Sequence, residues 1–152
     1  MRYEKSYERV ARETGLVFSW STHYSMSVAG EYGLYIQNTD PDLTLHIQSL
    51  SLSATQNGFF SSQAVSGTAT GTTVVGGYWN GEKPQVAKAN AKNGGVGGLT
   101  PLGTYSYLRA EANKATPLYD VDGAFWIPTG AAVAFKFSVI ADVEINIVGY
   151  YE

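Results

Sequence analysis

The sequence predicts an all-β protein, a jelly-roll-like antiparallel β-sandwich with an extended or weakly helical N-terminal arm. Three observations support this fold class. The 152 residues include 11 Tyr, 6 Phe, 3 Trp and 17 Gly, a composition that favours strands and tight turns. Apolar and polar residues alternate with a period of two in several segments, which is typical of strands with one buried face. Turn residues separate these segments at short intervals, as a sandwich requires.

The length of the chain fits one domain, so we assign residues 17–152 to a single β-sandwich domain and residues 1–16 to an N-terminal docking arm. A formal net charge of -3 disfavours a nucleic-acid partner, which would need a basic surface. The chain has no Cys, which excludes disulfides and thiolate catalysis. The first 15 residues lack the apolar core of a signal peptide, and no later apolar stretch could span a bilayer. We therefore expect a soluble protein made in a cytoplasm, with no membrane partner.

The N-terminal half of the domain contains three predicted strands. In residues 18–28 the even positions are mostly apolar and the odd positions are Ser or His, which places Trp20 and Tyr24 in the core. A second strand over residues 32–36 ends at the Asp-Pro-Asp turn that follows it. In the third strand, residues 43–52, the apolar phase changes once near Gln48 and Ser49. This change predicts a β-bulge or a strand that bends from one sheet to the other.

The middle of the chain, residues 54–103, contains 11 of the 17 glycines and cannot form a stable helix. We expect short strands over residues 72–79 and 85–89. The sequence Trp-Asn-Gly-Glu at residues 79–82 predicts a hairpin turn, because Asn-Gly tolerates the positive φ of a type I′ turn. The glycine-rich residues 93–98 are predicted to form an exposed, mobile loop.

Four segments predict strands in the C-terminal part of the chain. Residues 104–112 and 117–128 have strand composition, and residues 132–140 and 143–151 have the clearest alternation in the sequence. Only Ala141 and Asp142 separate the last two segments, so we expect them to form a hairpin. The whole domain should then contain eight or nine short strands.

No motif in the sequence indicates catalysis or metal binding. Asp120 to Gly123 resembles the start of a calcium loop, but the position that should carry the last Glu ligand is Ala131. His23 and His46 lie on the polar phase of their strands, without a carboxylate at a spacing that would complete a metal site. No serine lies in G-x-S-x-G, and no phosphate-binding glycine motif is present. We expect no enzyme activity, no catalytic residue, no metal site and no cofactor.

Three aromatic residues beside turns are candidates for contact with a ligand or another subunit: Tyr78, Trp79 and Trp126. Aromatic rings stack on the apolar face of sugars, and they are also common in protein interfaces. The alternative is that these rings are ordinary core or strand-pairing residues.

The N-terminal arm concentrates much of the charge of a chain that is only 15% charged. After Arg12 no Lys or Arg appears until Lys83. As a helix, the arm would place two tyrosines and a valine on one stripe, although its like-charge pairs make that helix weak. The alternative is a frayed terminus without contacts. The residues that we predict to bind a partner are Arg2, Tyr3, Lys5, Tyr7, Arg9, Val10 and Arg12.

The C-terminal residues 127–151 resemble part of a known group of proteins. The sequence Ile-Pro-Thr-Gly is followed by an alternating strand, a short turn and a closing strand with Val-Gly-Tyr near its end. This pattern is similar to the C-terminal hairpin of small tailed-phage virion proteins with β-sandwich folds, most of all capsid decoration (cement) proteins. The Ser-, Thr-, Gly- and Ala-rich middle and the lack of Cys are similar to that group too.

The resemblance implies a structural protein of a bacteriophage virion that does no chemistry. It implies a homotrimer of jelly rolls on the outer surface of the capsid, fastened to the major capsid protein partly by the N-terminal arm. Such a protein stabilises the shell by adding buried area across subunit boundaries. The alternative is a carbohydrate- or receptor-binding β-sandwich of a phage fibre or tail, with Tyr78, Trp79 and Trp126 as stacking residues.

Overall fold

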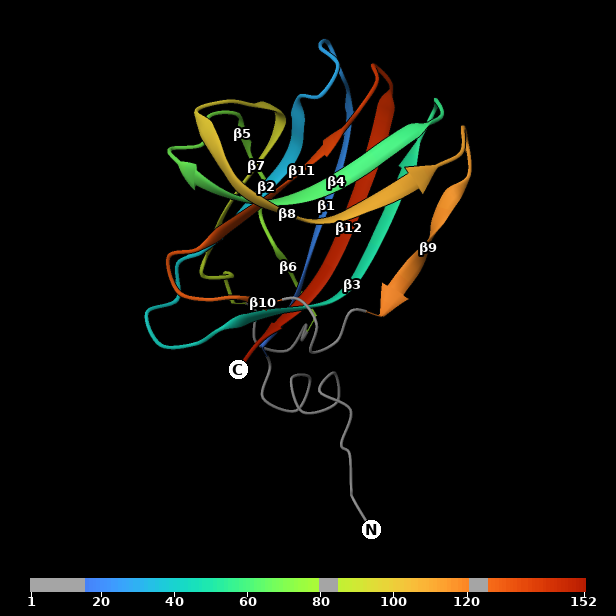
Figure 1. Cartoon of the computed structure of the whole chain (residues 1–152). Coiled ribbons are helices and arrows are strands. Elements are labelled where there is room, and N and C mark those ends of the chain that lie inside the picture. Colours follow the sequence, from blue (N-terminus) through green and yellow to red (C-terminus); the bar gives the residue numbers. More distant parts are fainter. Residues whose placement is uncertain (1–15, 80–84, 121–125) are drawn as a thin grey trace.

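The computed structural model describes residues 16–79, 85–120 and 126–152, and for residues 115–120 it describes the backbone alone. The described residues form two antiparallel β-sheets packed face to face, without a helix (Figure 1). This confirms the predicted all-β sandwich. The predicted arm, the turn at residues 79–82 and the Asp-Val-Asp-Gly segment lie wholly or partly outside the described residues.

Each sheet has six strands. In sheet A the order is β10 (Trp126–Ile127), β3 (Leu45–Ala54), β12 (Asp142–Tyr151), β1 (Val17–Ser25) and β6 (Gly77–Tyr78), and β9 (Ala115–Asp120) also pairs with β3. In sheet B the order is β5 (Thr72–Thr73), β7 (Ala89–Val96), β2 (Tyr32–Asn38), β11 (Ala132–Phe137), β4 (Gly58–Gly67) and β8 (Leu99–Ala110). The described residues thus form twelve strands, more than the expected eight or nine, and three of them, β5, β6 and β10, have only two residues.

The strand pairs are nested in the manner of a jelly roll. β1 pairs with β12, β2 with β11, β3 with β9 and β4 with β8, so the chain folds like one long hairpin that is then rolled up. The strands β5, β6 and β7 are an insertion between β4 and β8. The order of the strands therefore supports the jelly-roll form of the sandwich.

The core lies between the sheets and is built from the alternating apolar residues of both. Sheet A contributes Phe18, Trp20 and Ile147, and sheet B contributes Leu34 and Phe135, all of them fully buried. The predicted core position of Trp20 is confirmed, and Tyr24 packs against the same cluster while remaining partly exposed. β1 ends at Ser25, three residues earlier than predicted.

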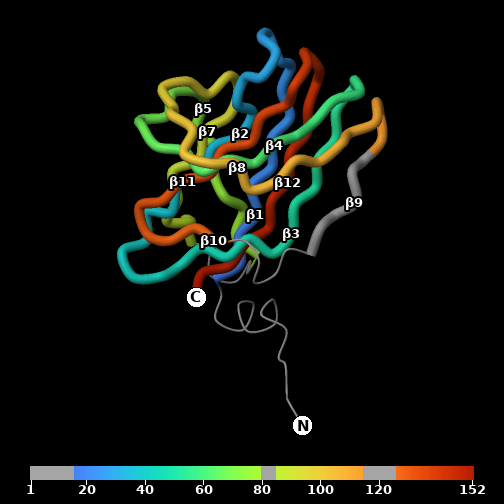
Figure 2. Tube along the Cα trace, in the orientation of Figure 1, coloured from blue at the N-terminus to red at the C-terminus, as the bar shows by residue number. Residues whose placement is uncertain are grey.

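The predicted hairpin between residues 132–140 and 143–151 is wrong. β11 belongs to sheet B and β12 to sheet A, and the chain crosses from one layer to the other through residues 138–141 (Figure 2). Both strands direct large apolar side chains into the same core, from Val133 to Phe137 in β11 and from Val143 to Ile147 in β12, as two hydrogen-bonded neighbours would. β11 is also buried on its other face, where Ala132 and Ala134 pack in a second cluster. A four-residue connection is long enough for either arrangement.

The glycine-rich middle also differs from the prediction. Residues 72–79 are not one strand, because β5 lies in sheet B and β6 in sheet A. The strand predicted at residues 85–89 begins only at Ala89, and it continues to Val96 through most of the segment that was predicted as a mobile loop. Pairing with β2 supplies the hydrogen bonds that make this glycine-rich segment a strand.

The predicted phase change in the third strand is confirmed as a β-bulge. β12 pairs with both Ser49 and Ile47 of β3, and the register shifts between them, which leaves Gln48 without an opposite residue. β3 remains in sheet A on both sides of the bulge, so the strand does not change sheets.

Candidate functional site

A row of large side chains crosses the outer face of sheet A at one end of the sandwich. Trp126 of β10 pairs with His46 of β3, which pairs with Tyr150 of β12, which pairs with Val17 of β1. Directly paired residues project to the same face of a sheet. The imidazole of His46 stacks on the Tyr150 ring, with centroids 5.0 Å apart and an angle of 8° between the planes. We call these four residues the outer row.

The outer face of sheet A changes from polar to apolar along its strands. Along β12 the outward positions are Asp142, Glu144 and Asn146, and then Val148 and Tyr150. Along β1 they change from exposed His23 to buried Val17, which packs with Tyr150 and Val148. A sheet face that is in contact with water usually carries polar side chains along its whole length, so the apolar half of this face is unusual. Val17 and Tyr150 are only 1% and 2% exposed, so the member of the outer row that offers a large exposed surface for contact is Trp126, at 52%.

The three predicted aromatic contact residues do not lie together. Tyr78 is directed inward and stacks on Phe18, with ring centroids 5.1 Å apart. Trp79 is 47% exposed, and its backbone N–H donates to the Val17 carbonyl, at the edge of sheet A where β6 lies. Trp126 is 52% exposed and lies at the β10 edge. Four strand spacings separate β6 from β10, which puts the two indoles about 19 Å apart.

The predicted arm residues, from Arg2 to Arg12, lie outside the described residues. The structure does fix the point where the chain enters the sandwich. The backbone N–H of Tyr151 donates to the carbonyl of Leu16, at 3.2 Å. Leu16 therefore lies beside the outer row, at the same end of sheet A as both exposed indoles.

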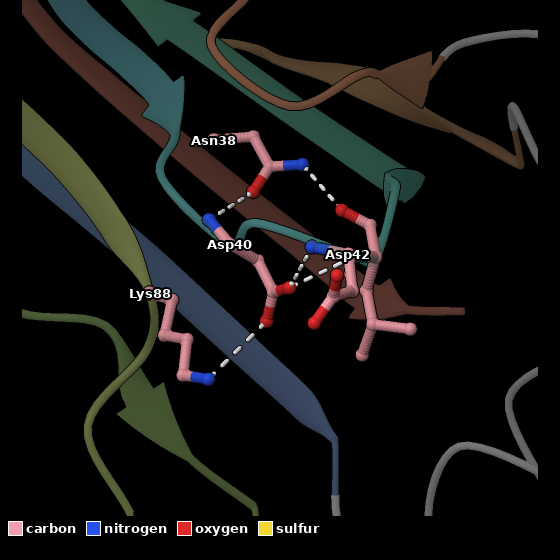
Figure 3. Close-up of polar contacts among 5 residues, drawn as sticks. Asn38, Asp40, Asp42 and Lys88 are labelled. Atoms are coloured by element: carbon pink, nitrogen blue, oxygen red, sulfur yellow. Dashed lines mark hydrogen bonds and ion pairs between the residues drawn. The ribbon is translucent and has the colours of Figure 1, made fainter.

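A buried polar network shapes the loop that leads into β3 (Figure 3). The Asn38 side chain is fully buried, and its Nδ2 donates to the carbonyls of Leu43 and Ile127 at 2.8 and 2.9 Å. Asp40 Oδ1 accepts the backbone N–H groups of Asp42 and Leu43, and Lys88 Nζ lies 3.7 Å from Oδ2. Every oxygen of the Asp40 carboxylate thus has a partner. The network holds β10, and with it Trp126, against β3.

The carboxylate of Asp40 should make stability depend on pH. The N–H of Asp42, then that of Leu43 and the charge of Lys88, stabilise the ionised form and lower the pKa of Asp40. A lowered folded-state pKa gives stability that is present above the usual aspartate pKa of about 4 and is lost as pH falls through the folded-state value. We expect Asp40→Asn to lower the free energy of unfolding by about 1–2 kcal/mol at pH 7. Urea unfolding of both proteins from pH 7 to pH 2 measures this difference, which should shrink below pH 4; a constant difference would contradict this role of the charge.

An open groove of about 740 Å³ lies at the opposite end of the sandwich. Phe59, Arg109, Glu111 and Lys114 line it, together with Val139. Lys114 Nζ lies 2.8 Å from Glu111 Oε2, and this contact lowers the pKa of Glu111 and raises that of Lys114. The Arg109 guanidinium lies over the Phe59 ring, 5.4 Å from its centroid. Glu111 and Lys114 thus stabilise each other as ions, and the described groove presents no nucleophile beside a base.

The edge of sheet B beside this groove carries exposed apolar side chains that sequence reasoning missed. They are Phe59 of β4 and Leu102, Tyr105 and Tyr107 of β8, which we call the β8 ridge. The segment was predicted as an ordinary strand. The β8 ridge could have been predicted from Tyr105 and Tyr107, which are two positions apart and so share one face, while Leu108 lies on the opposite face.

The two histidines do not meet. His23 is opposite Glu144 and His46 is opposite Tyr150, so they lie on two sides of β12 and about 20 Å apart along it. Within the described ranges no group of three side chains is placed to bind a metal ion. In the same ranges no helix has the length and apolar character needed to cross a membrane.

The sequence matches no protein-family model, and no curated protein or solved structure is significantly similar to it.

Proposed function

We propose that this chain is a non-enzymatic structural protein of a bacteriophage virion. It acts as a decoration, or cement, protein that is made in the host cytoplasm and binds the major capsid protein on the outer surface of the shell. It binds as a homotrimer, and neither nucleic acid nor a membrane is a partner. Its effect is mechanical stabilisation of the capsid.

One observation carries this proposal: the N-terminal arm joins the sandwich at the same end of sheet A as two half-exposed indoles. Leu16 is hydrogen-bonded to Tyr151, next to the outer row. Trp79 and Trp126 are each about half exposed and lie on either side of that point. The arm and the indoles can therefore meet the same partner surface. Trp, Tyr and Arg are the usual anchors of protein interfaces; two indoles lie at this end of the sandwich, and the arm sequence contains two Tyr and three Arg.

The two termini of the domain also suit an arm that acts outside its own fold. β1 begins at Val17 and pairs with β12 along nine residue pairs. The core residues of β1, Phe18 and Trp20, lie within this paired region, and Leu16 packs against the same core. In this proposal the arm binds a capsid subunit, where Tyr3 and Tyr7 supply apolar anchors and the cationic residues pair with acidic groups.

Deletion of residues 1–15 tests the proposal. We expect the truncated chain to keep its sandwich, because Leu16 and the complete β1–β12 ladder remain. We expect its affinity for capsids to fall by at least 100-fold, because two tyrosines buried in an interface and several charge pairs would contribute binding free energy of that size. Co-sedimentation with shells that lack this protein measures binding, and circular dichroism checks the fold.

A double variant, Tyr3→Ala with Tyr7→Ala, separates the contribution of apolar anchoring to capsid binding from that of charge. Ser21→Ala is the matched control, because the Ser21 side chain is exposed on β1. Unchanged capsid binding by the folded deletion variant would refute the proposal.

The alternative, a carbohydrate- or receptor-binding module, has less support. Its sugar platform would combine Tyr78 and Trp79, yet the Tyr78 ring is stacked on Phe18. The remaining indoles are too far apart to hold one sugar ring between them. Saturable glycan binding that is lost in Trp79→Ala would favour this alternative over a decoration protein.

A further inference from the structure

We propose that the groove at the start of β4 binds an acidic sugar chain, with one of its carboxylates held by Arg109. The groove lies at the end of the sandwich opposite Leu16 and the two exposed indoles, so this inference does not rest on the proposed capsid role. It also differs from the sugar platform considered above, because neither Tyr78 nor Trp79 lines this groove.

The two sheets divide the charged residues of their strands by sign. The strands of sheet A contain three acidic residues and no Lys or Arg. The strands of sheet B contain no Asp or Glu and three cations, Lys92, Arg109 and Lys136. A chain with a net charge of -3 thus has one cationic sheet, which favours a negatively charged ligand there.

Arg109 is held in place without a carboxylate partner. Its guanidinium lies over the ring of Phe59, which is the residue directly opposite it in β4. Glu111 is near enough for the charge of Arg109 to lower its pKa, but its carboxylate is bound to Lys114. Among the described residues no carboxylate lies within ion-pair distance of Arg109. The planar guanidinium can therefore offer a ligand carboxylate two parallel hydrogen bonds.

Two further polar side chains of the groove are placed as hydrogen-bond donors. Asn57 Oδ1 accepts the backbone N–H of Ala112 at 2.8 Å, which leaves the Asn57 Nδ2 group to donate. Ser138 Oγ accepts the backbone N–H of Phe59 at 2.9 Å, which leaves the Ser138 hydroxyl hydrogen to donate. A groove lined by donors fits a ligand that is rich in acceptor oxygens, as a carboxylated sugar is.

The groove also has the size and the aromatic side chains of a sugar site. Its volume of about 740 Å³ lies within the usual range for small-molecule sites. Phe59 is 46% exposed, and Tyr107, two residues before Arg109 on the same face of β8, is 69% exposed. Exposed aromatic rings of this kind can stack on the apolar face of a sugar.

A second cation lies along the outer face of sheet B at a distance that suits a chain of sugars. Lys136 is half-buried, and its Nζ lies over the Tyr32 ring, 5.7 Å from the centroid. Lys136 pairs with Ser61, and Ser61 pairs with Tyr107, two residues before Arg109. The Cα atoms of the two cations are therefore about 12 Å apart. One carboxylate cannot reach both cations, whereas an oligomer with a carboxylate on every unit can.

The backbone around the groove favours a sugar over an acidic peptide. Residues 60–65 of β4 pair with β11 on one side and with β8 on the other. β8 is the edge strand, but Pro101 and two register shifts interrupt it. Extended peptides are recognised mainly through main-chain hydrogen bonds at a continuous sheet edge. The contacts that this site offers come instead from side chains.

The test measures binding of the hexamer of galacturonic acid to the full chain by isothermal titration calorimetry. We expect saturable binding, which Arg109→Met should weaken by about 10-fold and Lys136→Met by about 5-fold, because Met keeps the apolar stem and removes only the charge. The matched control is Lys92→Met, which changes the net charge equally on sheet B, four strand spacings from Arg109. This control should keep the wild-type affinity, and circular dichroism verifies the fold of each variant.

A second comparison needs no variant. The fully methyl-esterified hexamer has the same sugar chain without its negative charges, and wild-type protein should bind it about 10-fold more weakly. Equal affinity for the two hexamers, or no saturable binding of the acidic one, would overturn the site.

The remaining outcomes identify what binds and where. Equal losses in Lys92→Met and Arg109→Met would show general attraction to the cationic sheet and overturn the role of the groove. Equal affinity for hexaglutamate would contradict the choice of a sugar. Loss of binding in Trp79→Ala, which should bind normally, would move the site to the other end of the sandwich. None of these results depends on capsid binding, which the deletion of residues 1–15 tests separately.

Discussion

Replacement of Trp20 by Ala is expected to lower the free energy of unfolding by about 3–5 kcal/mol. Trp20 is 1% exposed and lies on the inner face of β1, with its ring centroid 6.2 Å from that of Phe18. The backbone of Gly76 lies directly against the indole, and a Cβ on that glycine would be only 2.8 Å from Nε1. The wall opposite the indole is thus main chain, which cannot move far to fill the cavity.

Urea unfolding at pH 7 measures the effect. Since small domains are stable by only about 5–15 kcal/mol, the variant should unfold at a much lower urea concentration or be partly unfolded without it. Ser21→Ala is the matched control, because Ser21 is the next residue of β1 and its side chain is exposed on the other face. A loss below 1 kcal/mol for Trp20→Ala would show that the core can close over the missing ring.

Replacement of Asn38 by Ala is expected to lower the free energy of unfolding by about 3 kcal/mol, although it removes little apolar surface. The side chain makes two hydrogen bonds as donor and accepts the backbone N–H of Asp40 at 2.9 Å. Without it, the buried carbonyl of Ile127 and the partly buried carbonyl of Leu43 lose a donor, and each unsatisfied buried group costs about 1–3 kcal/mol.

The Asn38 variant should also change the surroundings of Trp126, because Ile127 is the next residue of β10. We expect faster hydrogen exchange at the amides of Trp126 and Ile127 and in the loop of residues 39–44, together with a shift in tryptophan fluorescence. Asn146→Ala is the control, since Asn146 is exposed on the outer face of β12. Equal stability and exchange in the two variants would exclude a structural role for the Asn38 amide.

The strands could be predicted where the pattern of apolar residues depends on that strand alone and not on its neighbours. The alternation in β1 and the phase change in β3 are both local, because burial of one face requires a period of two and a bulge shifts it by one. The partner of a strand is not local. β11 and β12 show the same pattern whether they lie side by side or face each other across the core. For that reason the pattern of the last two strands predicts one sheet, although they lie in two.

The candidate surfaces were predicted only in part for a related reason. Trp79 and Trp126 are identifiable as aromatics beside turns, but the distance between them depends on the order of five strands. Tyr105 and Leu102 are exposed because β8 has bulges against β4, and the register of a neighbour cannot be read from β8 itself. The role of Asn38 depends on Ile127, which is 89 residues away in the sequence.

The attachment of Leu16 to the ladder between β1 and β12 has a mechanical consequence. If residues 1–15 anchor the protein, a pull along β1 would load all nine residue pairs of that ladder at once, in shear. The hydrogen bonds would then have to break together, whereas a pull across the strands would open them one after another. The jelly roll places the first and last strands side by side, so the point of attachment is also a place where the domain can resist tension.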